Sequence, residues 1–224
     1  MFLNFIQVEV DMLVGERMSH PVIHIPPGIS VPDALNLMNR EQIRRLPIIS
    51  DGKLVGIVSD KDLIHASASS ASSLSIWELN YLLSKVMVRE VMTTKVKTVS
   101  TDTPIEEAAR IMADYKIGGL PVLKDGGVVG IITETDLFKI FLELLGAREP
   151  GVRVAVLVAD QPGSLARLTQ GVASMGGNII ALGQFLGESS ANREVTFKVR
   201  GLSQEEVTTM VTPLVDRLLD VRTT

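Results

Sequence analysis

Two stretches of the chain carry apolar residues at the spacing of one helix face. They are Val31, Ala34, Leu35 and Met38 in the first stretch, and Ile105, Ala108, Ala109 and Met112 in the second. Positions i, i+3, i+4 and i+7 lie on one side of an α-helix, so both stretches are predicted to be amphipathic helices. Ser30 with Asp33 is expected to cap the first helix. Thr103 with Glu106 is expected to cap the second, with Pro104 at its first position.

After each helix the pattern changes to two short apolar runs joined by an Asp-Gly dipeptide. Residues 46–49 and 54–58 are joined through Asp51 and Gly52, and the second copy repeats this pattern as far as residue 132. Asp-Gly between apolar runs favours a tight β-hairpin. An extended piece precedes each helix and a further helix follows each hairpin. Each copy is therefore predicted as strand, helix, strand, strand, helix.

The two copies form one long internal repeat. An offset of 74 positions, from 14 to 88, aligns residues 14–64 with 88–138 without a gap. The matched residues include Met18 with Met92, Val22 with Val96, Leu46-Pro47 with Leu120-Pro121, and Asp51-Gly52 with Asp125-Gly126. A repeat of this length predicts two similar folded units.

The last strand of each copy runs directly into a helix start. Ser59 is followed three residues later by Asp62, and Thr133 by Asp136. Unpaired N–H groups at a helix start, together with the hydroxyl, suit an anion such as phosphate. The acid one turn into the helix can accept hydrogen bonds from the vicinal hydroxyls of ribose. Together these features indicate a nucleotide, although the same pattern also describes an ordinary capping box that binds only its own backbone.

Composition excludes several functional classes. The formal charge of −4 argues against nucleic-acid binding, and the lack of Cys excludes disulfides and thiolate chemistry. The start of the chain lacks a signal-peptide pattern, and no apolar run reaches the ~20 residues of a membrane span. We expect a soluble, cytoplasmic protein. His20, His24 and His65 form no evident catalytic or metal-binding set, so no enzyme and no metal site is predicted.

The repeat resembles the CBS domain family across about residues 12–145. The paired Leu-Pro strands, the Asp-Gly hairpins and the two glycine-to-aspartate stretches, 56–62 and 130–136, carry the resemblance. It implies a tandem pair packed sheet against sheet, with two clefts that bind AMP, ADP, ATP, S-adenosylmethionine or NAD. It also implies phosphate contacts from Ser59 in one site and Thr133 in the other. Asp62 and Asp136 would then contact ribose.

The resemblance assigns further residues to nucleotide binding. They are Val22, His24, Arg44, Arg45, Leu46, Pro47, Val96, Gly119, Leu120 and Pro121. His24 is expected near the adenine. Arg44 and Arg45 stand where the second copy has two glycines, and arginine makes strong charge-assisted contacts with phosphate.

A more highly phosphorylated ligand is therefore expected in the cleft that Arg44 or Arg45 reaches. The alternative is that both arginines are solvated cations at a helix end. Asp60 and Glu134 add negative charge beside the sites, which would oppose a triphosphate unless Mg²⁺ accompanies it.

Two other regions flank the second copy. Residues 66–75 are rich in Ser and Ala and are predicted to be a linker, or alternatively a lid over the cleft. Residues 76–83 include the only Trp and are predicted to form a helix that packs on the module or on a second subunit. Beyond a boundary at 146–151, the pattern predicts β, α, β, β, α, β, with Ser203 and Glu206 capping the second helix. This order is typical of a ferredoxin-like layer of helices on one antiparallel sheet.

The C-terminal part resembles the ACT domain family over about residues 152–222. Asp160-x-Pro-Gly163-x-Leu165 and Gly177-Asn178-Ile179 carry the resemblance. It implies a sensor for an amino acid or another small effector that pairs with a second copy, with effector contacts at Asp160, Gly163 and Asn178. The alternative is that Asp160 and Asn178 only stabilise turns and that the domain serves dimerisation.

The chain is therefore predicted to be an α/β (α+β) protein with a tandem CBS pair and a ferredoxin-like ACT domain. The predicted segments are an extension at 1–11, CBS domains at 12–68 and 86–145, linkers at 69–85 and 146–151, and the ACT domain at 152–224. This order resembles the acetoin-utilisation type of CBS and ACT proteins. It implies a homodimeric regulator, with no required cofactor, that responds to adenosine nucleotide and acts on a partner enzyme. The alternative is a structural module whose clefts stay empty.

Overall fold

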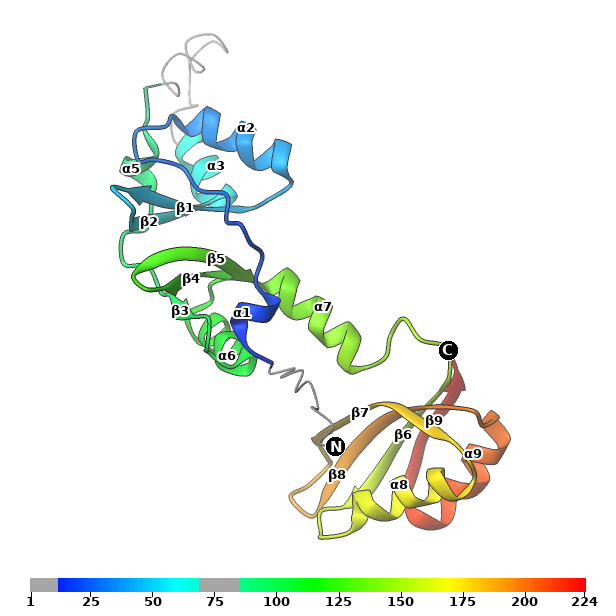
Figure 1. Cartoon of the computed structure of the whole chain (residues 1–224). Helices are drawn as coiled ribbons and strands as arrows, with labels where there is room; N and C mark the ends of the chain where they lie inside the picture. The colour runs from blue at the N-terminus through cyan, green and yellow to red at the C-terminus, as the bar shows by residue number, and fades with distance from the viewer. Residues whose placement is uncertain (1–11, 69–84) are drawn as a thin grey trace, which may run out of the picture. The chain divides into compact units, whose positions relative to one another are not determined.

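The computed structural model describes residues 12–68 and 85–224 of the chain (Figure 1). They belong to two compact units, of which the first ends at Leu137 and the second runs from Phe138 to Thr224. The division falls within helix α7 (Glu134–Leu144), so the predicted connection 146–151 belongs to the second unit. The predicted N-terminal extension and the predicted helix at 76–83 lie outside the described residues.

From its first long helix onwards, the first repeat folds as its hydrophobic pattern predicts. Its elements are helix α2 (Val31–Glu41), strands β1 (Arg45–Ser50) and β2 (Lys53–Ser59), and helix α3 (Asp60–Ala68). Ser30 caps α2, because its hydroxyl accepts a hydrogen bond of 3.3 Å from the Asp33 amide. The hairpin turns at Asp51 and Gly52, whose φ angles of 50° and 74° lie in the left-handed region that this dipeptide tolerates.

The second repeat has the same order of elements, with one further short strand before its first long helix. They are strand β3 (Val99–Ser100), helix α6 (Ile105–Tyr115), strands β4 (Gly119–Lys124) and β5 (Gly127–Thr133), and helix α7. The predicted cap of α6 is wrong, because the helix begins at Ile105 and Pro104 occupies the cap position. The Thr103 hydroxyl instead accepts a hydrogen bond of 3.0 Å from the Ser100 amide, which fixes the turn before the helix.

The two hairpins of the first unit lie next to each other. β1 pairs with β2 and β4 with β5, both antiparallel, while β3 joins β4 in parallel. In the first repeat the matching parallel contact is a single bridge between Ile25 and Ile48. Strands β2 and β5 contact each other, with α2 and α3 covering one hairpin and α6 the other (Figure 1). The helix stripes predicted from the sequence form the core between each hairpin and its helices.

The segments before the two repeats are exchanged between the halves. They contain the short helices α1 (Val14–Arg17) and α5 (Val88–Val91). After α1, Ser19 and Ile131 exchange two backbone hydrogen bonds, so the start of the first repeat lies on the second. After α5, Thr93 and Ile57 do the same in the opposite direction. The space between the halves is consequently lined by both repeats.

Two glycines permit this exchange. A Cβ atom on Gly56 would lie 2.5 Å from Sδ of Met92, and one on Gly130 would overlap Sδ of Met18. The glycines that begin the two repeated stretches therefore let the exchanged segments approach the strands closely.

The second unit contains one sheet and two helices. Its elements are β6 (Val152–Ala159), α8 (Ser164–Ser174), β7 (Asn178–Leu186), β8 (Asn192–Arg200), α9 (Gln204–Val211), a 3₁₀ turn (Thr212–Leu214) and β9 (Arg217–Thr223). The strands lie in the order β7-β8-β6-β9 and every pair is antiparallel. The predicted β, α, β, β, α, β order is confirmed, and so is the capping of α9 by Ser203 and Glu206.

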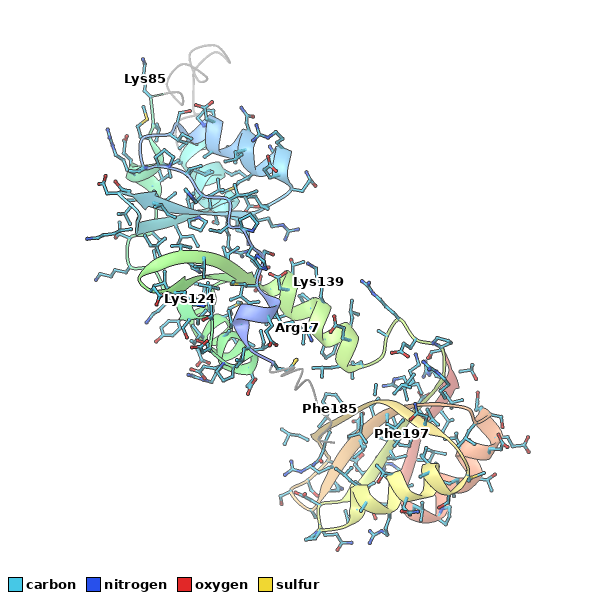
Figure 2. All side chains as sticks on the ribbon, viewed as in Figure 1. Arg17, Lys85, Lys124, Lys139, Phe185 and Phe197 are labelled. Atoms are coloured by element: carbon cyan, nitrogen blue, oxygen red, sulfur yellow. The ribbon has the colours of Figure 1, made fainter. Side chains whose placement is uncertain are left out.

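Both helices of this unit cover the same face of the sheet (Figure 1). Its core includes Val154 and Val156 from β6, Phe197 from β8 (Figure 2), and Leu168 from α8. Because side chains alternate along a strand, the neighbours of these residues lie on the opposite, helix-free face. Across residues 12–68 and 85–224, no helix combines the length and the apolarity that a membrane span requires.

Candidate functional site

A cavity of about 410 Å³ lies between the two repeats of the first unit. Its lining residues are Arg44, Arg45, Ile57, Ser59, Asp60, Lys61, Asp62, Thr93, Lys95, Val96, Lys97, Lys116, Ile117, Gly118, Gly119 and Glu134. Six of them are cationic and three are acidic, so the cavity carries a formal excess of three positive charges in a chain whose net charge is −4. Such a local excess favours an anionic ligand.

Ser59 and Asp62 form a closed pair on one side of this cavity. One carboxylate oxygen of Asp62 accepts hydrogen bonds of 2.8 Å from the Ser59 amide and 2.7 Å from its hydroxyl. In return, the Asp62 amide donates to the Ser59 hydroxyl over 3.3 Å. The pair is therefore a capping box, yet it faces the cavity and leaves the second oxygen of Asp62 without a hydrogen bond among the described residues. Capping and ligand binding are thus compatible at this position.

The predicted unpaired N–H groups at this helix start are not observed. The amide of Asp60 donates to the carbonyl of Arg44, that of Lys61 to the Asp60 carboxylate, and that of Asp62 to Ser59. The first turn of α3 is satisfied by its own side chains and by the preceding strand. An anion in the cavity would be held chiefly by the cationic side chains rather than by the helix start.

Arg45 extends from the first repeat across to the second. Its guanidinium lies 3.8 Å from a carboxylate oxygen of Glu134, and 24% of the side chain is exposed. A Cβ atom on Gly118 would lie 2.7 Å from Cζ of Arg45, and one on Gly119 would lie 3.1 Å from its Cδ. The two glycines therefore provide the space that Arg45 fills. Arg44-Arg45 and Gly118-Gly119 are equivalent positions in the two repeats. In the structure, Arg45 lies against both glycines.

We expect Gly118→Ala to weaken nucleotide binding while leaving the fold stable. The added methyl group displaces only the mobile ends of Arg45 and Glu134, so the free energy of unfolding should change by less than about 1 kcal/mol. The guanidinium would move out of the cavity, and affinity for ATP in a calorimetric titration should fall by about tenfold. Gly28→Ala is the matched control, because nothing lies within 4 Å of the new Cβ atom. Equal affinities of the two variants for ATP would contradict the role of Arg45.

The corresponding pair in the second repeat has a different environment. The amide and hydroxyl of Thr133 donate to one oxygen of Asp136 over 3.0 and 2.7 Å, as in the first repeat. The hydroxyl of Ser19, in the exchanged segment, lies 3.5 Å from the other oxygen. Asp136 is only 5% exposed, whereas Asp62 lines the cavity. The structure therefore distinguishes two acids whose motifs look equivalent in the sequence.

The four cavity lysines were not identified from the sequence. They are Lys61, Lys95, Lys97 and Lys116. The repeat offset places Thr135, Pro21, Ile23 and Gln42 at the equivalent positions, and none of these carries a charge. Comparison of charged positions between the copies would have revealed this asymmetry. Lys97 is held over the ring of Tyr115, with its ammonium 4.1 Å from the ring centre.

The other predicted nucleotide-binding residues fall into three groups. Arg44, Val96 and Gly119 line the cavity together with Arg45. Val22 is partly buried and His24 is exposed, and neither belongs to the lining. The two Leu-Pro pairs are buried in β1 and β4 and do not line the cavity: Leu46, Pro47, Leu120 and Pro121. Both leucines are 0% exposed, which indicates a role in the core.

The predicted effector residues of the second unit do not converge within one chain. Asp160 and Gly163 line a small cavity of about 160 Å³, where the Asp160 carboxylate pairs with Arg193 at 2.8 Å. Gly163 has a φ angle of 88°, which glycine adopts more readily than other residues. Asn178 pairs with Arg200 at the start of β7, whereas Asp160 follows the β6 residue that pairs with Asn192. The strand register thus places Asp160 and Asn178 at opposite ends of the sheet.

Comparison with known families identifies the first unit. The CBS domain profile matches residues 14–69 and 88–143, which together make up half of the chain. The chain therefore belongs to the CBS domain family, and its first unit contains a tandem CBS pair.

Curated relatives place this pair in proteins of different kinds. The uncharacterized protein MJ1225 of Methanocaldococcus jannaschii is 30% identical over 60% of this chain and 49% of its own length. A CBS domain-containing protein of Dictyostelium discoideum is 32% identical over 61% of this chain and 95% of its own length. The L-aspartate semialdehyde sulfurtransferase of M. jannaschii is 34% identical over 58% of this chain, but the match spans only 23% of that enzyme.

Two solved structures resemble the CBS pair in both fold and sequence. The CBS pair of protein MJ0100, in complex with methylthioadenosine and S-adenosylmethionine, has a TM-score of 0.51 and 32% identity. The match covers 61% of this chain and 98% of that one. A protein assigned to acetoin utilization in Vibrio cholerae has a TM-score of 0.52 and 34% identity, over 62% of this chain and 97% of that one.

Proposed function

We propose that the CBS pair is a sensor that binds a phosphorylated adenosine compound in the 410 Å³ cavity. The observation that carries this proposal is the excess of cations in the cavity that the Ser59–Asp62 pair also lines. The cavity volume lies within the range of small-molecule sites, about 300–1,000 Å³. The similarity to a CBS pair solved with two adenosine compounds supports the choice of the nucleoside.

In this proposal, Asp62 and the cationic side chains contact different parts of the ligand. The free oxygen of Asp62 accepts a hydrogen bond from a ribose hydroxyl, while the lysines and arginines neutralise the phosphates. Asp60 and Glu134 add negative charge to the cavity, so a triphosphate binds better when Mg²⁺ accompanies it. Phosphate also competes with Glu134 for Arg45.

Ligand binding would affect the arrangement of the two repeats. Asp62 and Arg45 belong to the first repeat, whereas Lys95, Lys97 and Lys116 come from the second. A ligand that contacts both sets binds more tightly to the arrangement in which both are within reach, and it shifts the population towards that arrangement. This is the basis of the proposed regulation of a partner enzyme.

Thermal unfolding with adenosine compounds tests the proposal. ATP, ADP, AMP, S-adenosylmethionine, NAD and adenosine would each be added to the full chain. A ligand at about a hundred times its Kd stabilises the native state by about 2.7 kcal/mol. We expect the phosphorylated compounds to raise the melting temperature more than adenosine, and Asp62→Ala to abolish the shift.

Asp33→Ala is the matched control for this variant. The Ser30–Asp33 pair caps α2 with the same 3.3 Å amide contact but does not line the cavity. Both variants should lose about 1 kcal/mol of stability through the lost cap. Only Asp62→Ala should lose the response to ligand. If no adenosine compound stabilises the wild type, the pair serves instead as a structural module for assembly.

We also propose that the second unit is an ACT domain that mediates homodimerisation and senses a small effector, such as an amino acid. The β, α, β, β, α, β topology and the Asp160–Gly163 cavity support this assignment. Strand β7 is a sheet edge, and it exposes Phe185 (Figure 2) together with Leu182 and Leu186. An exposed apolar edge favours pairing with a second copy. We further propose that the chain is linked to acetoin breakdown, which the similarity to the acetoin utilization protein of Vibrio cholerae supports.

A further inference from the structure

A row of three cations crosses the helix-free face of the sheet in the second unit. Arg153 on β6 is directly opposite Lys198 on β8 and Arg222 on β9. Residues directly opposite each other on antiparallel strands project from the same face, and like charges in such pairs destabilise the sheet. The repulsion among these three cations is reduced if anions lie beside them.

The described residues supply only one anion to this row. Asp220 accepts hydrogen bonds of 2.9 Å from Arg153 and of 2.7 and 2.8 Å from Arg222. The hydrogen bond from Arg222 lowers the pKa of the Asp220 carboxyl, with Arg153 contributing in the same direction. Asp220 is therefore shared by the two arginines.

Lys198 is the cation without an acidic partner. It is 6% exposed, and its ammonium donates a hydrogen bond of 3.1 Å to the carbonyl of Gly146. No ion pair of Lys198 is formed within the described part of the chain. A buried charge is costly unless it is paired as well as hydrogen-bonded. One carbonyl leaves further donors of the ammonium group for another acceptor.

A mainly apolar cavity of about 250 Å³ lies beside these cations. Arg153 and Lys198 line it together with Leu145, Ala147 and Ala181. Its volume equals that of about eight water molecules at about 30 Å³ each, which suits a short aliphatic chain. Thr196 is the polar neighbour on β8.

We propose that this cavity binds a short aliphatic carboxylate. The carboxylate lies between Lys198 and Arg153, and the hydrocarbon chain lies against Leu145, Ala147 and Ala181. The apolar lining favours a carboxylate over inorganic phosphate, which would lose its hydration there without apolar contacts in return. The site is separate from the Asp160–Gly163 cavity, because the strand register places it nearer the opposite end of β6.

Saturation-transfer NMR on the full chain tests this proposal. The probes are butanoate, isovalerate and hexanoate, with isovaleramide as the uncharged isostere of isovalerate and inorganic phosphate as a competitor. We expect at least one carboxylate to bind and the amide to bind about ten- to a hundredfold more weakly, as for loss of a hydrogen bond to a charged group. Phosphate should not displace the bound carboxylate.

Lys198→Met removes the charge and retains the length of the side chain. It should weaken binding of the carboxylate by about ten- to a hundredfold. Lys139→Met, at an exposed position of α7, is the matched control and should bind as the wild type does. The proposal is overturned if no carboxylate binds, if the amide binds equally well, if phosphate displaces the carboxylate, or if folded Lys198→Met retains full affinity. If Lys198→Met fails to fold, the comparison of acid and amide on the wild type decides.

Discussion

Replacing Lys95, Lys97 and Lys116 together by Gln is expected to lower the affinity for ATP by about a hundredfold. All three side chains line the same cavity as Asp62. If each contributes about 1 kcal/mol to phosphate binding, their joint loss is about 3 kcal/mol, and each 1.4 kcal/mol corresponds to a factor of ten. The affinity for adenosine should change little, because adenosine carries no phosphate.

Isothermal titration calorimetry at two salt concentrations provides the measurement. Binding of ATP to the wild type should weaken as salt increases, since ions screen the partly exposed charges. The variant should show a smaller dependence on salt. The control replaces Lys53, Lys124 and Lys139 by Gln, which removes the same charge from exposed positions outside the cavity. Equal loss of ATP affinity in the two triple variants would show that only the net charge of the chain matters.

Leu46→Ala is expected to reduce the free energy of unfolding by about 2–5 kcal/mol without changing the intrinsic affinity for ATP. The family resemblance assigns Leu46 to the ligand, but the side chain is 0% exposed and belongs to the core of the first repeat. Truncation of a buried leucine removes its packing and leaves a cavity, which accounts for the expected range.

Urea unfolding and calorimetric titration of the same variant separate stability from binding. Leu120→Ala should behave in the same way, because Leu120 occupies the equivalent buried position in the second repeat. Ile64→Ala is the control on an exposed side chain of α3 and should alter stability by about 0.5 kcal/mol or less. A large drop in ATP affinity of folded Leu46→Ala, with unchanged stability, would assign this leucine to the ligand after all.

The sequence allowed the fold of each repeat to be predicted because the relevant signals are local. The stripe from Val31 to Met38 requires only helical spacing, and the turn at Asp51 and Gly52 requires only backbone preferences. The order of elements in the C-terminal unit followed from the same kind of signal. The prediction that Thr103 caps α6 is wrong because its hydroxyl accepts a hydrogen bond from a nearer group, the Ser100 amide.

The composition of the cavity was harder to predict because it depends on contacts between distant segments. Ser59 and Asp62 could be identified from a motif, whereas Lys95 and Lys97 reach the cavity only because the segment before the second repeat is exchanged onto the first. Arg45 could be identified as a candidate phosphate ligand, but its contact with Glu134 depends on how the halves face each other. No periodicity along the chain encodes these contacts.

The difference between the two acidic positions has the same origin. Asp62 and Asp136 occupy identical positions in their motifs, and each accepts hydrogen bonds from the amide and hydroxyl of the residue three positions earlier. Only Asp136 lies within 3.5 Å of a hydroxyl from the exchanged segment, that of Ser19. The repeat offset places Thr93 at the equivalent position, where it lines the cavity. The sequence distinguishes the two sites only by Arg44 and Arg45, whereas the fold also gives the two acids different neighbours.

The most direct test of the central claim is a calorimetric titration of the full chain with ATP. We predict one site per chain that binds at least about tenfold more tightly than any other, because six cationic side chains line the cavity that Ser59 and Asp62 share. This site should be lost in Asp62→Ala and retained in folded Asp136→Ala. Two sites of equal affinity, or loss of the tight site in Asp136→Ala but not in Asp62→Ala, would contradict the account.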